Sequence, residues 1–164
     1  MSPNYVIGCM IGYVVSVLGG HLATRCVMDA LWKSLGRTVD KAFRIYPKHP
    51  QMAGVLERAL YTAAWQLGKP EFIGVWLAVK VAGQWKGWSE PFTDEDSGKK
   101  IPGRAFFNLF LIGNAFSIAY ALVGGLMIEW ISKPLLAPAI GVPIVLGAGT
   151  VFFSRWANNS KEGA

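Results

Sequence analysis

The chain has 164 residues, of which 52% are hydrophobic and 16% charged, and its formal net charge is +6 at pH 7. Soluble domains carry about 25% charged residues, so this composition argues against an ordinary soluble protein. A positive balance can indicate nucleic-acid binding, but no basic run accompanies a nucleic-acid fold motif here. Because Lys and Arg collect on the cytoplasmic side of membrane proteins, we expect a membrane protein without a nucleic-acid partner.

Three runs of the sequence contain no charged side chain, at 5–22, 105–128 and 135–154. Each reaches the roughly 18 residues that a transmembrane helix requires. We expect spans over about 5–24, 105–129 and 135–154 in one all-α membrane domain, 1–164. No basic side chain precedes the first run, so it is not typical of a cleaved signal peptide. We expect it to be retained, in a bacterial inner membrane.

Small residues recur every fourth position along the first span. This stripe consists of Gly8, Gly12, Ser16, Gly20 and Thr24. Residues at this spacing share one helix face, and small side chains let two helix backbones approach closely. The stripe predicts close packing against a helix of the same chain or of another subunit. It also suggests a homo-oligomer packed through the first helix.

An amphipathic segment follows at about 31–46. Its apolar stripe consists of Leu31, Leu35, Val39, Phe43 and Tyr46, and its basic stripe of Lys33, Arg37, Lys41, Arg44 and Lys48. This pattern predicts an interfacial helix on a bilayer with anionic headgroups. A helix packed on the cytoplasmic part of the protein itself is the alternative.

The segment 51–86 is apolar but interrupted at its midpoint by Leu67-Gly68-Lys69-Pro70-Glu71. Glycine is favoured just after a helix and proline at the first position of the next one. The sequence therefore predicts a broken helical hairpin. In one continuous span, Lys69 and Glu71 would lie near the bilayer centre, at a cost of about 2.5–3.5 kcal/mol each.

The distribution of basic residues favours a hairpin that does not cross the membrane. In that topology 15 of the 16 Lys and Arg residues lie on one side and only Lys133 on the other. The positive-inside rule then predicts an external N-terminus, a cytoplasmic C-terminus, and Lys69 and Glu71 at the cytoplasmic interface. Four transmembrane helices are the alternative, as is a re-entrant hairpin with a buried turn.

A polar, turn-rich loop is expected at 87–104, before the next span. That span carries Asn108 and Asn114 among few polar residues. Asn114 and Ser117 are three residues apart and share a face, so we expect both to hydrogen-bond a neighbouring helix. In the last span, Pro143 predicts a kink.

No HExxH, CxxC, Walker A or GxSxG motif is present, so we predict no catalytic residues, metal or cofactor. Polar residues inside membranes are functional candidates by default. The set consists of Glu57, Arg58, Lys69, Glu71, Asn108 and Asn114. Three functions remain open. The first, which we favour, is a non-enzymatic small membrane subunit that self-associates or docks to a partner through close helix packing. The second is a pore or transport element lined by the hairpin and the third span. The third is a lipid-headgroup enzyme, with Glu57 or Glu71 as base and Arg58 or Lys69 holding phosphate.

Overall fold

The computed structural model describes residues 2–34, 49–89, 92–93, 100–133 and 136–159. The first helical stretch contains α1 (Pro3–Val14), the π-helical segment η1 (Val15–Gly19) and α2 (Gly20–Ser34). Then follow α4 (His49–Gln66), α5 (Glu71–Ser89), α6 (Gly103–Ser132) and α7 (Leu136–Asn159). Two-residue strands, β1 (Phe92–Thr93) and β2 (Lys100–Ile101), pair antiparallel between α5 and α6. The expected loop 87–104 therefore begins as helix and contains a short hairpin.

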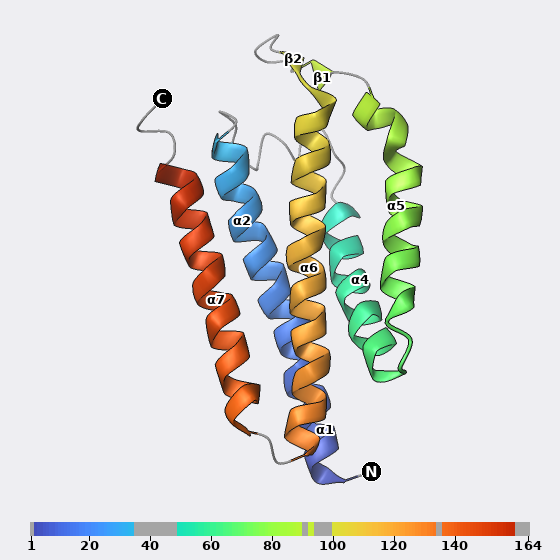
Figure 1. Ribbon diagram of the computed structural model, residues 1–164, viewed down its shortest axis with the longest axis vertical. Coiled ribbons are helices and arrows are strands. Elements are labelled where there is room, and N and C mark those ends of the chain that lie inside the picture. Colours follow the sequence, from blue (N-terminus) through green and yellow to red (C-terminus); the bar gives the residue numbers. More distant parts are fainter. Residues whose placement is uncertain (1, 35–48, 90–91, 94–99, 134–135, 160–164) are drawn as a thin grey trace.

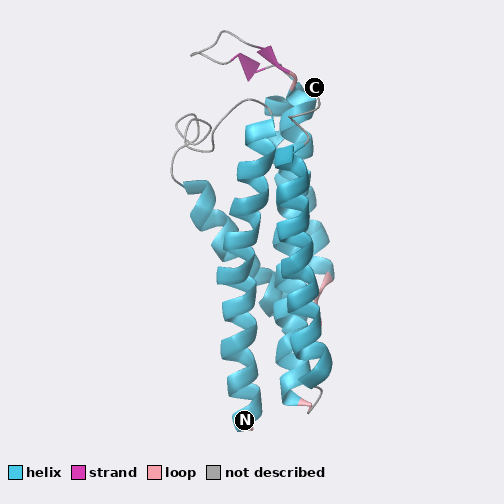
Figure 2. Cartoon of the chain, turned by 90° about the vertical axis from the view of Figure 1, so that its left-hand side faces the viewer, coloured by secondary structure: helices cyan, strands magenta, loops and turns pink. Residues whose placement is uncertain are grey.

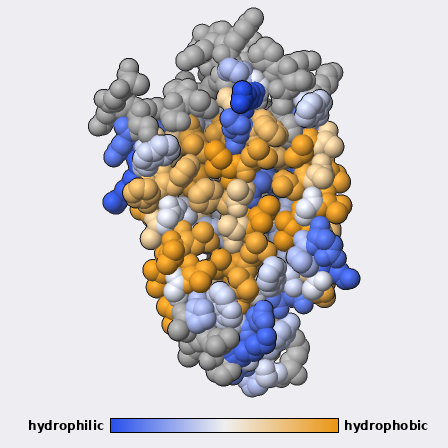
Figure 3. Space-filling model, in the orientation of Figure 1, coloured by the Kyte–Doolittle hydropathy of each residue, from blue (hydrophilic) through white to orange (hydrophobic). Residues whose placement is uncertain are grey.

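Within the described residues, three helices are long and apolar enough to span a membrane: Pro3–Lys33, Gly103–Ser132 and Pro138–Asn159. They correspond to the three spans predicted from the charge-free runs, and an all-α membrane fold is confirmed. Large apolar side chains such as Met10, Leu22 and Phe152 are exposed on the outside of the bundle. Figure 3 shows the resulting hydrophobic band across the middle of one face of the molecule.

Helix α6 is the centre of the bundle, in contact with α1, α2, α4, α5 and α7. In Figure 1, the continuous helix from α1 to α2 runs upward and α6 runs downward beside it, so the two are antiparallel. Helix α7 runs upward beside α2. Helices α4 and α5 form a hairpin on the other flank of α6. Figure 2 shows the long axes of the bundle from the side.

The first helix begins where its sequence supplies a cap. The Ser2 side chain accepts a hydrogen bond from the Tyr5 backbone at 3.3 Å, and Pro3 occupies the first helical position. Both satisfy the helix start, where backbone N–H groups lack internal partners. The helix then continues through η1, which widens one turn of the backbone around Ser16.

The small-residue stripe of α1 lies against α6 of the same chain. A Cβ at Gly8 would be 3.1 Å from the Ile128 carbonyl oxygen, and one at Gly12 would collide with the Gly124 carbonyl. The stripe is thus buried at Gly8, Gly12, Ser16 and Gly20. The stripe was expected to be the contact between subunits, and this part of the expectation is wrong, because α6 of the same chain already packs against it. The oligomer itself stays a prediction.

The turn between α4 and α5 follows the predicted stop and restart. Gly68 has φ of +66°, the left-handed conformation that glycine adopts without steric cost. Lys69 N–H donates to Ala64 O at 2.9 Å and Gly68 N–H to Trp65 O at 3.0 Å, the two bonds of a Schellman motif. Glu71 then begins α5.

The position of this turn differs from the sequence prediction. The Gln66 side chain donates to Gly125 O at 2.7 Å, and Gly125 is only about two turns from the end of α6. The turn therefore lies toward the N-terminal end of α1, while the C-terminal end of α5 and strand β2 lie at the opposite end (Figure 1). The placement of Lys69 and Glu71 at the same interface as the 87–104 segment is wrong. The error arose because α4 and α5, with 18 and 19 residues, are long enough to run along most of α6.

Most of the expected interfacial helix lies outside the described residues, including Arg37, Lys41, Arg44 and Lys48. Its start is the end of α2, where Lys33 and Asp29 form an exposed ion pair at 2.6 Å. Pro143 lies inside α7, which continues on both sides of it.

Candidate functional site

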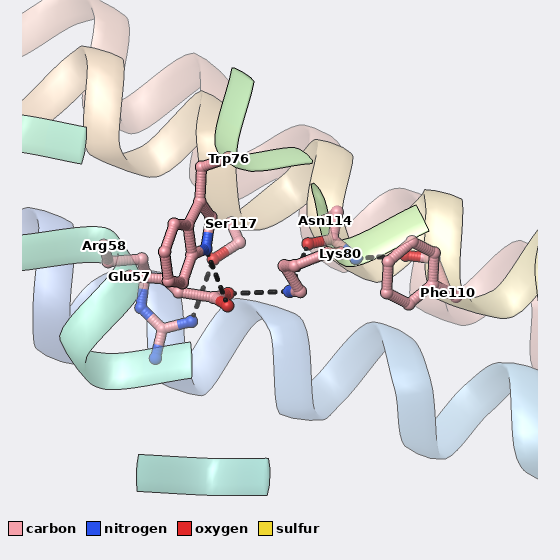
Figure 4. Close-up of polar contacts among 7 residues, drawn as sticks. All are labelled: Glu57, Arg58, Trp76, Lys80, Phe110, Asn114 and Ser117. Carbon is pink, nitrogen blue, oxygen red and sulfur yellow. Dashed lines mark hydrogen bonds and ion pairs between the residues drawn. The ribbon is translucent and has the colours of Figure 1, made fainter. Parts of the chain in front are cut away.

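A cluster of polar side chains lies between α4, α5 and α6 at the middle of the bundle (Figure 4). Its α6 members are Asn114 and Ser117, and Ser117 is 14 residues from Gly103 and 15 from Ser132. Because α6 is long and apolar enough to span a membrane, the cluster would lie near mid-depth of a bilayer that α6 crosses. Polar groups at this depth have no water to satisfy them, so their partners must come from the protein.

An ion pair joins α4 to α5 in this cluster. Lys80 Nζ lies 2.8 Å from Glu57 Oε2 and donates a second hydrogen bond of 2.8 Å to Asn114 Oδ1. Trp76 Nε1 donates to the other Glu57 oxygen at 3.2 Å. Lys80 Nζ also lies 5.2 Å from the centre of the Phe110 ring, within cation–π range. Three helices thus share one network, centred on a carboxylate that is largely enclosed.

Asn114 completes the link to α6. Its amide donates to the Phe110 carbonyl one turn earlier at 2.7 Å, which fixes the orientation in which Oδ1 faces Lys80. The expectation that Asn114 and Ser117 bond a neighbouring helix is confirmed, since Ser117 accepts from Arg58 Nη1 at 3.2 Å.

Arg58 is the most enclosed charge of the cluster, with 3% of its surface exposed. Its aliphatic part lies on Gly20 of α2, where a Cβ would be 2.6 Å from Arg58 Cδ. Its Nε is buried and has no hydrogen-bond partner. Among the described residues no carboxylate pairs with this guanidinium.

A chain of buried hydroxyls continues from Arg58 toward α1. Thr62 Oγ1 lies 2.7 Å from Ser16 Oγ and 3.2 Å from Ala121 O, and Ser16 Oγ donates to Arg58 O at 3.3 Å. Ser16 belongs to the π-helical segment η1. Such segments are frequent at functional sites, but here the wide turn also brings Ser16 to the backbone of α4.

The structure brings together three of the six predicted polar residues, Glu57, Arg58 and Asn114. Lys69 and Glu71 are exposed at the α4–α5 turn, away from the cluster, and Asn108 is exposed on α6. Lys80 and Trp76 also belong to the cluster, although neither is among the six predicted residues. Their spacing of four residues on α5 was the available signal, because it places both on one face.

Within the described part of the chain, no group of three or more His, Cys, Asp or Glu side chains could hold a metal ion. Each Glu57 oxygen accepts one hydrogen bond, from Trp76 and from Lys80. The cluster can hold charge, join helices and bind a counter-charge.

No protein-family model matches the chain, and no curated protein or solved structure shows significant similarity to it.

Proposed function

We propose that the chain is a small non-enzymatic membrane subunit that self-associates, with the outer face of α5 as the contact between copies. The observation that carries this proposal is a second small-residue stripe. Gly74, Ala78 and Ala82 recur every four residues on α5 and are all exposed. Nothing lies within 4 Å of a Cβ built at Gly74.

The first stripe indicates what such a pattern does in this protein. On α1, small residues at the same spacing allow the α6 backbone to approach at Gly12. Two helices that approach closely make more van der Waals contacts with each other than either makes with lipid chains, and this favours helix association in a bilayer. The α5 stripe has the same capacity, and none of the described helices of the chain packs against it.

Helix α7 also faces outward, but its surface differs. Val145 and Phe152 are 72% and 73% exposed, and such large side chains suit contact with lipid chains. Glycine is present there too, at Gly141 and Gly149, each with open space around it. The regular spacing of small residues on α5 makes that helix the better contact, and α7 the comparison surface.

The headgroup-enzyme alternative is the least supported. Glu57 and Arg58 lie at the level of Ser117, about four helical turns from either end of α6, where headgroups do not reach. Lys69 and Glu71 lie at the α4–α5 turn, at a different depth from Arg58. Of the two candidate bases, Glu57 is therefore near Arg58 but far from the headgroups, and Glu71 is far from Arg58.

A transport element is the second candidate function. It is favoured by the depth of Glu57, Arg58 and Lys80, since ionisable residues inside a membrane mark solute or proton sites in many transporters. The hydrogen bonds that close this network weigh against a continuous aqueous path. Asn108, expected on the pore lining, is exposed outside the cluster.

We further propose an orientation with the N-terminus outside and the C-terminus in the cytoplasm of a bacterial inner membrane. Arg25, Lys33, Arg104 and Arg155 lie toward one end of the bundle and Lys69 and Lys133 toward the other. The richer end is the cytoplasmic one by the positive-inside rule, and it would face anionic headgroups.

The α5 contact is tested by replacing Ala78 with Leu and measuring the oligomeric mass in nanodiscs by native mass spectrometry. We expect the wild-type chain to form an oligomer and Ala78→Leu to shift it toward monomer. Ala148→Leu, on the exposed surface of α7, is the matched control and should leave the assembly unchanged. A monomeric wild type, or an oligomer lost only in the Ala148 variant, would overturn the proposal.

A further inference from the structure

Arg58 has more hydrogen-bonding capacity than its surroundings use. A guanidinium group carries five N–H donors and is charged at every physiological pH. With 3% of Arg58 exposed, bulk water cannot satisfy them. Nη1 donates to Ser117 Oγ, whereas Nε has no partner and no described residue accepts from Nη2.

The charges of the cluster do not balance. Glu57 is engaged by Lys80 and Trp76, so one carboxylate faces two cations, Lys80 and Arg58. The described cluster therefore carries one uncompensated positive charge near mid-depth of the bilayer. An isolated charge is strongly disfavoured there, which makes a bound counter-charge the physical expectation.

A second buried donor without a partner lies on α2, one helical turn from the residue that contacts Arg58. Arg58 Nε lies 3.2 Å from the Cβ position of Gly20, so this side of the guanidinium faces α2. Thr24 follows Gly20 by one turn on the same face of α2, and its Oγ1 is buried without a partner. On the α4 side the terminal nitrogens lie over Gly54, where a Cβ would be 3.5 Å from Nη1 and 3.8 Å from Nη2. Gly20 is thus packed tightly on the Cδ–Nε part of Arg58, whereas Gly54 leaves ordinary contact distances over the terminal nitrogens.

We propose that Arg58 binds a small oxyanion, a carboxylate or phosphate group, within the bundle between α2 and α4. The Nε and Nη2 donors of arginine are parallel and match two oxygens of such a group. The Thr24 hydroxyl donates to the same anion from α2. The bound oxyanion neutralises the cluster and satisfies both unpartnered donors. This site goes beyond the self-association proposed above and does not depend on it.

The oxyanion can come from a free solute or from a lipid, and two arms of one experiment separate these sources. In the first arm, the full chain in phosphatidylcholine nanodiscs is titrated with sodium acetate or sodium phosphate at constant ionic strength set with sodium chloride. In the second arm, nanodiscs contain phosphatidylglycerol and no added oxyanion. The readout in both is the midpoint of thermal unfolding.

We expect a saturable rise of the midpoint in at least one arm, beyond that with chloride, because a ligand that binds only the folded state stabilises it. Arg58→Gln should abolish the rise. Arg155→Gln, at an exposed arginine of α7, should retain it. Thr24→Val removes the hydroxyl at nearly the same size, and its half-saturation concentration should increase about tenfold, the effect of one charge-assisted hydrogen bond.

Absence of a rise in both arms, or a rise retained in Arg58→Gln, would overturn the proposal. If Arg58→Gln does not fold, Thr24→Val decides, since it keeps every charge. Unchanged half-saturation in that variant would then refute the site. The oligomeric mass of the same samples separates this outcome from failure of the α5 contact.

Discussion

Lys80 on α5 lies 2.8 Å from Glu57 on α4, and the pair holds the two arms of the hairpin together at mid-depth. The pair has little exposed surface, with 21% of the Lys80 side chain and 9% of the Glu57 side chain accessible. Burying two charges away from water costs free energy, and the hydrogen bonds from Trp76 to Glu57 and from Lys80 to Asn114 offset part of that cost.

Removing one partner of this pair should destabilise the fold. In Lys80→Met the carboxylate of Glu57 stays buried with Trp76 as its remaining donor, and we expect a loss of about 3 kcal/mol in unfolding free energy. The double variant Glu57→Gln/Lys80→Met leaves no buried charge from the pair and should lose less. Reversible unfolding in mixed micelles measures both.

Lys133→Met is the control for this prediction, because its pair with Glu129 is exposed at the end of α6. Surface pairs contribute about 0–1 kcal/mol. Equal losses in Lys80→Met and Lys133→Met would show that the mid-depth pair has no special energetic role.

The contact of Gly12 with Gly124 predicts that adding a single methyl group at Gly12 will destabilise the fold. A Cβ at Gly12 collides with the Gly124 carbonyl and would lie 2.5 Å from Ile128 Cγ1, so both helices must shift in Gly12→Ala. We expect a loss of about 1–3 kcal/mol in unfolding free energy. Gly149→Ala has nothing within 4 Å and should be neutral or stabilising, since alanine is the better helix former. A neutral Gly12→Ala would contradict the close helix approach.

The position of the α4–α5 turn predicts the side from which it can be labelled. With Cys9 and Cys26 replaced by alanine, single cysteines at Lys69, Arg104 and Lys133 are exposed to a membrane-impermeant maleimide. We expect the Lys69 and Lys133 sites to react from one side and the Arg104 site from the other. The Lys69 site should react more slowly than the Lys133 site, because the turn lies about 10 Å short of the end of α6. Labelling of the Lys69 and Arg104 sites from the same side would refute this arrangement of the hairpin.

Local rules were sufficient for much of the fold. Charge-free runs located three spanning helices, because the hydrocarbon core sets their length and excludes charge. The Gly68 break followed from backbone conformation alone, and the period of Gly8, Gly12, Ser16 and Gly20 identified a close-packing face.

The polar cluster was only partly visible in the sequence. Asn114 and Ser117 were identified as helix-bonding residues from their spacing on one face. The pairing of Lys80 with Glu57 was not predicted, because the two residues are 23 positions apart on different helices and no periodicity connects them.

The sequence by itself determined where the chain is helical and which faces are small, apolar or charged, since these depend on neighbours a few residues apart. Tertiary structure decided which surface meets which. It placed the α1 stripe against α6 rather than another copy, carried the Lys69 turn to the opposite end of the bundle, and gathered Glu57, Arg58 and Lys80 at one depth. Those outcomes depend on how helices distant in sequence pack, and that packing reflects the fit of all their side chains together.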